Sequence, residues 1–218
     1  MQIDLSKYKC AVFDCDGVIL DSNQLKIDAF RSVLVGEPVD LIEAFIDYHR
    51  STGGVSRYYK FKTFYADMKI VPDADAQAEA AILRYGEEVR KRLFSCPKIP
   101  GVERFLSLLN EAEIPCAVNS GGDQNEILDV FEERDLASYF RRTLGSPATK
   151  TENMTTLASE NFLEMPGVLF GDASSDLAAA MKFGLDFIFV AGVSDWDGGA
   201  EICRDQGHQV IQTFEDFF

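Results

Sequence analysis

A short apolar run that ends in two aspartates constrains this chain more than any other feature. Residues 10–13 are apolar, Asp14 and Asp16 follow with one residue between them, and Gly17 comes next. Four to eight apolar residues before a turn predict a buried strand. Both carboxylates would point the same way from the end of that strand, at the edge where open α/β sheets bind their ligands. Two like charges this close need a cation or a shared proton, so the pair indicates a site.

The Asp-x-Asp-Gly pattern also occurs in surface turns and in calcium-binding loops. An EF-hand loop needs further oxygen ligands and a glutamate at its twelfth position. Residues 18–20 are Val, Ile and Leu, which supply no such ligands. The sequence therefore argues against a calcium loop and leaves a surface turn as the structural alternative.

The charge of the chain restricts its partners. The 36 acidic and 21 basic residues give a formal net charge of −15. A chain this acidic is not expected to bind nucleic acid or an anionic membrane surface. An anionic substrate would need a local positive site or a metal ion.

Targeting and redox features point to a cytoplasmic protein. The first residues, from Met1, lack the basic-then-apolar pattern of a signal peptide. No apolar run reaches the roughly 18 residues of a membrane span. The five cysteines are widely spaced, odd in number and without a C-x-x-C pair, which predicts free thiols and neither disulfides nor a zinc site.

Strand and helix patterns alternate through most of the chain. Four further segments predict buried strands, with helical patterns between them: 115–119, 167–171, 186–190 and 208–211. Strands that alternate with helices predict a parallel sheet covered on both faces, which is an α/β fold.

One long segment departs from this alternation. Residues 20–96 contain no convincing strand pattern, and their apolar residues fall at helical spacing. We expect a helical domain there, inserted into an α/β core made of residues 1–19 and 97–218.

Two more segments carry polar side chains where a predicted strand gives way to a helix. Ser120 and Gly121 follow the strand at 115–119, and a hydroxyl beside glycine-rich backbone at a helix N-terminus can cradle an anion. Lys150 precedes a helical pattern, a position that the helix dipole disfavours. The ordinary alternatives are helix capping for Ser120 and a solvated loop position for Lys150.

The strand at 167–171 completes the pattern with Asp172 at its end and Asp176 near the start of the next helix. Acidic side chains also cap helices, which is the structural alternative. Capping does not explain why successive strand ends all carry this chemistry, so the sequence predicts one polar site at the edge of the sheet.

These four segments, in this order, resemble the haloacid dehalogenase-like hydrolases over essentially the whole chain. Residues 14–17 match the first motif of the family, Ser120 the second, Lys150 the third, and Asp172 with Asp176 the fourth. Within the family, the chain is similar to the phosphatases with an α-helical cap, the group of the phosphoglycolate phosphatases and β-phosphoglucomutases. The resemblance implies a Rossmann-like, doubly wound parallel sheet, with the helical segment as the cap.

The resemblance also implies an activity, which is Mg²⁺-dependent hydrolysis of a small phosphorylated metabolite, with a sugar phosphate as the first candidate. Asp14 would attack phosphorus to form an aspartyl-phosphate. Asp16 would protonate the leaving oxygen and then help a water molecule to hydrolyse the intermediate. Mg²⁺ would bind the Asp14 carboxylate, the Asp16 backbone carbonyl and the Asp172 carboxylate.

The remaining motif residues receive supporting roles from the same resemblance. Ser120 and the Gly121 amide would bind phosphoryl oxygens, and Lys150 would stabilise their charge and that of Asp14. Asp176 would hold Lys150 or a metal-bound water.

In the helical segment, residues 54–57 resemble the cap loop of β-phosphoglucomutases, which reaches into the active site. Arg57 would then bind the non-reacting phosphate of the substrate. The alternative is a helix that starts at Ser56 and leaves Arg57 solvated. Lys26, one helical turn beyond Ser22, is expected on an ordinary helix surface, with a position facing the cleft as the alternative.

Departures from the family pattern set the alternatives. Gly171 stands where the mutases have glutamate, which favours a phosphatase over a phosphomutase, and Asp16 argues against cleavage of carbon–halogen bonds. The branch that cleaves carbon–phosphorus bonds uses a Schiff-base lysine in its cap, for which Lys26, Lys60 and Lys62 are candidates. A catalytically silent domain that binds phosphorylated ligands or a protein partner is the alternative outside enzymes. The sequence determines neither the substrate nor the oligomeric state.

Overall fold

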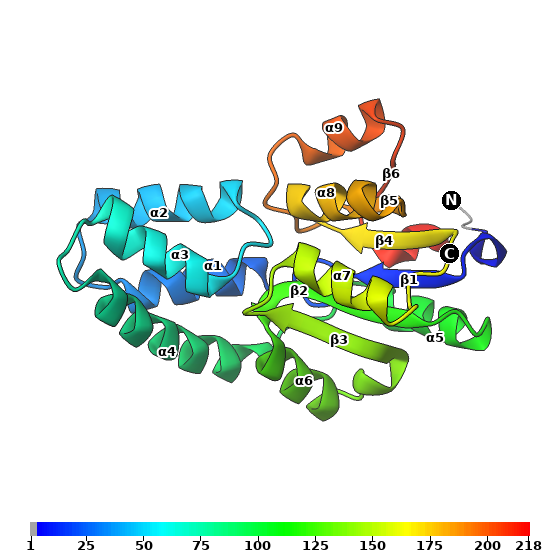
Figure 1. The fold of residues 1–218 in the computed structure, drawn as a ribbon, viewed down its shortest axis with the longest axis horizontal. Helices are drawn as coiled ribbons and strands as arrows, with labels where there is room; N and C mark the ends of the chain where they lie inside the picture. The colour runs from blue at the N-terminus through cyan, green and yellow to red at the C-terminus, as the bar shows by residue number, and fades with distance from the viewer. Residues whose placement is uncertain (1–3) are drawn as a thin grey trace.

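Six parallel strands form a single sheet in the computed structural model, which describes residues 4–218 (Figure 1). The strands are β1 (Cys10–Phe13), β2 (Cys116–Asp123), β3 (Phe140–Ser146), β4 (Gly167–Gly171), β5 (Asp186–Val190) and β6 (Gln209–Ile211). Their order across the sheet is β3-β2-β1-β4-β5-β6. The chain starts in the middle, runs to one edge and then returns to build the other, which confirms the predicted doubly wound α/β fold.

Helices cover both faces of the sheet. They are α5 (Val102–Glu111), α6 (Gln124–Glu133), α7 (Lys150–Ser159), α8 (Ser174–Phe183) and α9 (Gly199–Asp205), with the short helices η1 (Leu5–Lys7), η3 (Ala137–Tyr139) and η4 (Phe214–Phe217). Alternation along β1 divides the core in two. Ala11 and Phe13 pack with α5, α6 and η4, whereas Cys10 and Val12 pack with α7, α8 and α9.

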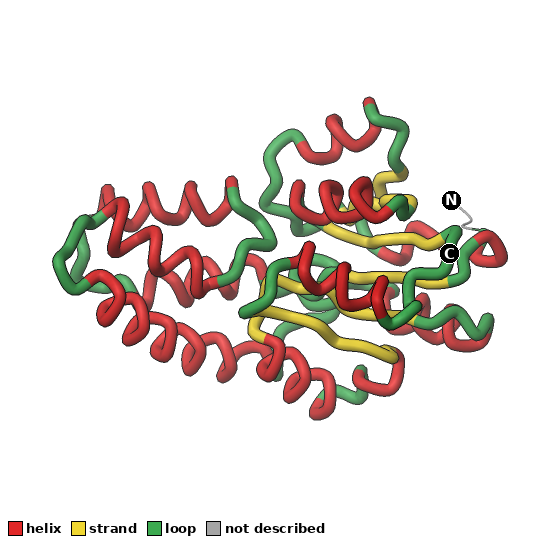
Figure 2. Tube along the Cα trace, in the orientation of Figure 1, coloured by secondary structure: helices red, strands yellow, loops and turns green. Residues whose placement is uncertain are grey.

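Every regular element between β1 and α5 in the described chain is helical, as Figure 2 shows on the left. The elements are α1 (Asn23–Val33), α2 (Val39–Ser51), α3 (Arg57–Thr63), η2 (Phe64–Met68) and α4 (Ala74–Leu93). We call residues 20–96 the helical insert. Its core is aromatic: Phe30 lies 4.2 Å from Tyr85 and 5.2 Å from Phe45 between ring centroids. The division of the chain into two domains at these boundaries stays a prediction.

The sequence missed one strand. Each of the four later strands that it predicted overlaps an observed one, namely β2, β4, β5 and β6, but β3 was not recognised. β3 is an edge strand in which Arg141 and Arg142 are exposed, so it lacks the apolar run that identifies a strand buried on both faces. Lys150, expected ahead of a helix, is the first residue of α7, which begins with a capping box at Thr149.

The remaining expectations about the chain have different outcomes. The five cysteines are free and buried, as predicted. None of the helices that residues 4–218 form has the length and apolar composition needed to cross a membrane. The expectation about the start of the chain concerns residues 1–3, which lie outside the described residues.

Candidate active site

The site lies where β1 ends, between its two neighbours in the sheet. β1 pairs in parallel with both β2 and β4, so the residues that follow these strands meet at one edge. Asp14 follows β1, and its backbone N–H donates a hydrogen bond of 2.9 Å to the carbonyl of Phe170 in β4. Ser120 lies in β2, and Asp172 follows β4. The predicted strand-end residues therefore come together.

Lys150 connects two of the predicted carboxylates. Its Nζ donates to Asp14 Oδ2 at 2.8 Å and to Asp176 Oδ1 at 2.6 Å, and all three side chains are buried. Burial alone would lower the pKa of Lys150, but the charges of Asp14 and Asp176 raise it above its ordinary value. The ammonium group therefore stays charged beside Asp14.

Three buried carboxylates form the most acidic part of the site. One oxygen each from Asp14, Asp172 and Asp176 lies within 4.8 Å of the others. Burial, together with the neighbouring carboxylates, raises the pKa of Asp172 well above its usual range and that of Asp176 to about 7. Lys150 brings one positive charge to these three groups, so a divalent cation would complete their charge balance. Oxygen ligands of this kind suit Mg²⁺, and the residues present fit that ion.

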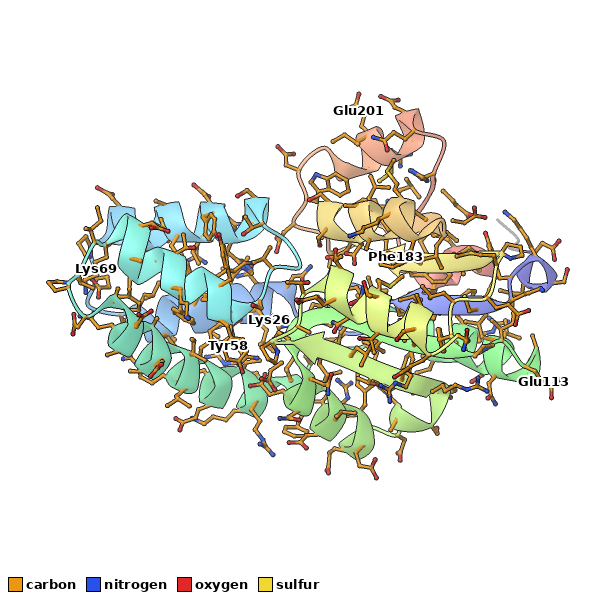
Figure 3. All side chains as sticks on the ribbon, viewed as in Figure 1. Lys26, Tyr58, Lys69, Glu113, Phe183 and Glu201 are labelled. Carbon is orange, nitrogen blue, oxygen red and sulfur yellow. The ribbon has the colours of Figure 1, made fainter. Side chains whose placement is uncertain are left out.

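The carboxylate of Asp16 points to the helical insert. Its Oδ1 accepts a hydrogen bond of 2.5 Å from Ser22 Oγ, and its Oδ2 forms an ion pair with Lys26. Burial would raise the pKa of Asp16, but the charge of Lys26, the hydrogen bonds from Lys26 and Ser22 and the charge of Lys150 together lower it. The expectation that Lys26 lies on an ordinary helix surface is wrong, because the first turn of α1 packs over the motif and directs this lysine into the cavity. Figure 3 shows Lys26 where the insert meets the sheet.

Close packing at Gly17 brings Asp172 against the first motif. Gly17 has a φ of +74°, and a Cβ there would lie 2.1 Å from Asp172 Oδ2. The same oxygen accepts a hydrogen bond of 2.7 Å from Asn23 Nδ2. The sequence did not predict a role for Asn23. The one sequence feature that could have indicated it is the position of Asn23 at the first residue of the helix after the motif.

The loop between α2 and α3 lies directly on the site. A Cβ on Gly121 would lie 2.1 Å from the carbonyl oxygen of Gly54, and a Cβ on Gly54 would lie 2.2 Å from Ser175 Oγ. Ser120 is fully buried beside this contact, and its Oγ accepts a hydrogen bond of 3.0 Å from the Gly122 N–H. Glycines on both sides therefore allow the helical insert to touch the predicted phosphate-binding segment.

Arg57 lines the cavity and is only 6% exposed, so the alternative of a solvated Arg57 is wrong. Both ends of its guanidinium pair with Glu126 of α6, with 2.7 Å between Nη1 and Oε1. The guanidinium also lies 4.9 Å from the centre of the Tyr85 ring. Ser56 precedes α3, but its side chain makes no capping hydrogen bond.

Of the other cavity residues, the sequence indicated only Lys60, as one of three candidate cap lysines. His49 of α2 and Lys60 of α3 line the cavity from the insert, and Asp195 and Trp196 line it from the loop after β5. Lys60 is buried, whereas Lys62, which the sequence left open for the same role, is exposed. These residues come from separate segments, so only the fold reveals that they share a cavity.

The comparisons with known proteins agree with this geometry. A phosphorylated carbohydrates phosphatase from Thermotoga maritima is 25% identical over 200 residues, which cover 88% of this chain and 89% of that protein. A solved structure of a β-phosphoglucomutase from Clostridium difficile has a TM-score of 0.74 at 15% identity, covering 97% of this chain and 93% of its own. A predicted phosphoglycolate phosphatase from Haemophilus somnus has a TM-score of 0.75 at 16% identity, with 96% of each chain covered. At these identities, the two structures establish a shared fold.

The family comparison covers the site itself. The sequence model of the haloacid dehalogenase-like hydrolases matches residues 11–190, a range that includes every core residue placed above at the strand ends. This chain therefore belongs to the haloacid dehalogenase-like hydrolase family and is an enzyme of the hydrolase class.

Proposed function

We propose that this enzyme is a Mg²⁺-dependent phosphatase that hydrolyses a small phosphate monoester through an aspartyl-phosphate on Asp14. The observation that carries the proposal is the buried Asp14 carboxylate. It lines the cavity, contacts Lys150 and lies close to the carboxylates of Asp172 and Asp176. A phosphorylated carbohydrate is the first candidate substrate, and the name of the Thermotoga maritima relative supports it.

The charges around the cavity support an anionic substrate. The chain as a whole carries −15, which would repel a phosphate ester. The basic side chains that line the cavity all come from the helical insert: Lys26, Arg50, Arg57 and Lys60. Four aspartates, Asp14, Asp16, Asp172 and Asp195, line the same cavity, so these basic side chains together with a divalent cation would supply the local positive charge that a phosphate ester needs.

In the first step, a carboxylate oxygen of Asp14 attacks phosphorus while the bond to the leaving oxygen breaks. Asp16 donates the proton that the leaving oxygen takes up. In the second step, water attacks the phosphorus of the aspartyl-phosphate and passes a proton to Asp16, which regenerates the Asp14 carboxylate. Lys26 and Ser22 favour the ionised form of Asp16. The second step requires this form, whereas the first step requires the protonated form, so Asp16 must take up a proton before each turnover.

Supporting residues stabilise the charge that develops on the phosphoryl group. Lys150 lies against Asp14, and the hydroxyl of Ser120 with the amide of Gly121 is the proposed phosphoryl-binding segment. Asp176 holds Lys150 in place. The carboxylates of Asp14 and Asp172 would hold Mg²⁺, together with the carbonyl of Asp16. When bound, the ion would stabilise the charge on the phosphoryl oxygens.

Hydrolysis of p-nitrophenyl phosphate with and without Mg²⁺ tests this function, followed by a panel of phosphorylated metabolites that includes phosphonoacetaldehyde. We expect release of inorganic phosphate that stops on chelation and in Asp14→Asn. Isomerisation of a sugar phosphate in the presence of a bisphosphate activator would identify a phosphomutase instead. Binding without any turnover across the panel would identify a silent phospholigand-binding domain.

A further inference from the structure

Lys60 is a buried cation at the cavity wall whose charge is not matched. Its side chain is 1% exposed and lines the same cavity as Asp14. Its Nζ contacts Nδ1 of His49 at 2.7 Å and the carbonyl oxygen of His49 at 3.2 Å. An ammonium group has three N–H donors, so one donor is left over. Among residues 4–218, no carboxylate lies within 4.0 Å of this Nζ.

The other basic side chains at the cavity differ from Lys60 in this respect, because each has a carboxylate partner. The pairs are Lys26–Asp16, Arg57–Glu126 and Arg50–Asp47. Arg57, to which the sequence assigned a second phosphate, is bound at both ends of its guanidinium by Glu126. Among the described basic side chains of the cavity, Lys60 is therefore the one that has no carboxylate partner and can offer its charge to a ligand.

The surroundings of Lys60 disfavour its positive charge unless an anion binds beside it. Burial lowers its pKa to about 7, and the charges of Lys26 and Lys150 act in the same direction. The charges of Asp16 and Asp195, which also line the cavity, offset this in part, and neither carboxylate lies within ion-pair distance of Lys60. Burial also lowers the pKa of His49 well below its usual value, so its imidazole is neutral and its Nδ1 can accept from the ammonium. A buried charge without a partner is costly, and a ligand anion would remove that cost.

We propose that Lys60 is a specificity-determining residue that binds a second anionic group, a carboxylate or phosphate, on the leaving-group side of the substrate. Because Asp14 and Lys60 line one cavity, a single small molecule can contact both. This inference rests on the proposed phosphatase function and narrows it: the preferred substrate is a phosphate ester whose leaving group carries its own negative charge, in contrast to a neutral sugar phosphate.

Matched ester pairs test this inference. Phosphoglycolate is compared with 2-hydroxyethyl phosphate, and 6-phosphogluconate with glucitol 6-phosphate, so that within each pair a carboxylate replaces a neutral alcohol. We expect the wild-type enzyme to have the higher kcat/KM for the anionic member of at least one pair. Loss of a charge-assisted contact typically reduces binding about tenfold or more, so Lys60→Met is expected to lower this preference by about that factor, mainly through KM.

Two further variants serve as controls. Lys62→Met removes an exposed lysine from the same helix and is expected to leave the preference unchanged. Arg57→Met tests the assignment that the sequence suggested. If the preference falls in Arg57→Met and not in Lys60→Met, the role belongs to Arg57 and our assignment to Lys60 is overturned.

A binding measurement makes the test independent of turnover and of how well Lys60→Met folds. Titration calorimetry with the Asp14→Asn protein compares the affinities for the same four compounds. Equal affinities within both pairs would overturn the inference without any variant at position 60. Tight binding of the anionic members without hydrolysis by the wild-type enzyme would instead support the Lys60 site and contradict the phosphatase function.

Discussion

Lys150 and the carboxylates around it show how single residues prepare this site for chemistry. The ammonium group contacts both Asp14 and Asp176, and the charges of these carboxylates keep it protonated despite its burial. Asp14 is thereby held in one orientation at the cavity wall, as the proposed role of nucleophile requires.

Asp14→Asn is expected to abolish turnover and leave the fold intact. The amide is nearly isosteric with the carboxylate but cannot act as an anionic nucleophile, and loss of such a residue costs on the order of 10⁴-fold or more. The measurement is kcat for p-nitrophenyl phosphate with Mg²⁺, with circular dichroism to verify folding. Retention of more than about a tenth of wild-type activity would contradict covalent catalysis by Asp14.

Gly17 offers a second prediction at this scale, with a matched control at Gly36. Both glycines have positive φ, but a Cβ on Gly17 would lie 2.1 Å from Asp172 Oδ2, whereas a Cβ on Gly36 meets nothing within 4 Å. Each substitution by alanine should cost about 1–2 kcal/mol of stability through backbone strain. Gly17→Ala should in addition displace Asp172 and raise the Mg²⁺ concentration needed for half-maximal activity. An equal Mg²⁺ requirement in both variants would show that Gly17 matters for backbone conformation alone.

At the scale of elements, polar side chains of the helical insert reach α6 and the strand before it. Arg57 pairs with Glu126, the hydroxyl of Tyr58 donates to Asp123 Oδ2 at 2.6 Å, and Figure 3 shows Tyr58 at this junction. A third contact, Arg90 with Asp129, is about half exposed at both side chains. The insert is thus held over the cavity by polar contacts of very different burial.

Glu126→Gln and Asp129→Asn should therefore have unequal effects on the free energy of unfolding. Removing one partner of a buried ion pair typically costs about 3 kcal/mol or more, because the other charge is left buried and unpaired. An exposed pair is worth about 0–1 kcal/mol. Urea denaturation of the two variants measures the difference. Comparable losses would mean that the insert moves away from α6 in solution and exposes Arg57 to water.

For the molecule as a whole, the acidic cluster opposes folding in the absence of a cation, and it could hold a divalent metal ion. Burial and the neighbouring carboxylates raise the pKa of Asp172, so the folded protein favours the protonated form of this group more than the unfolded chain does. This contribution to stability is present at low pH and is lost as the pH rises through the raised pKa. A bound divalent cation would remove the repulsion and stabilise the folded state by linkage.

Asp172→Asn should therefore stabilise the protein in EDTA while it impairs activity. The gain in melting temperature over wild type should be larger at pH 8 than at pH 5, because the Asp172 carboxylate of the wild type is more protonated at the lower pH. With Mg²⁺, the wild type should gain stability and the variant much less, and the variant should need far more Mg²⁺ for activity. Full wild-type activity in excess EDTA would contradict the metal site.

Local sequence patterns predict most of the candidate residues at the strand ends. Asp14, Ser120 and Asp172 each follow a strand pattern that an α/β fold converts into position, whereas Lys150 is predicted from its place before a helical pattern and from the family resemblance. Parallel strands bring their carboxyl ends to one edge, so strand ends that are distant along the chain meet without further information. β3 was not predicted because it is a partly polar edge strand whose sequence contains no apolar run.

The contacts between the helical insert and the candidate site are visible in the folded protein alone. The pairing of Lys26 with Asp16, of Arg57 with Glu126 and of Lys60 with His49 joins side chains from separate elements. These contacts depend on two features of the fold. The aromatic core of the insert sets the angles between its helices, and close contacts at glycines allow the insert to pack against the sheet. Whether a basic side chain is paired with a carboxylate depends on which residues lie next to it in three dimensions. The sequence therefore shows which residues are basic, but it does not show which of them remains free to bind a ligand.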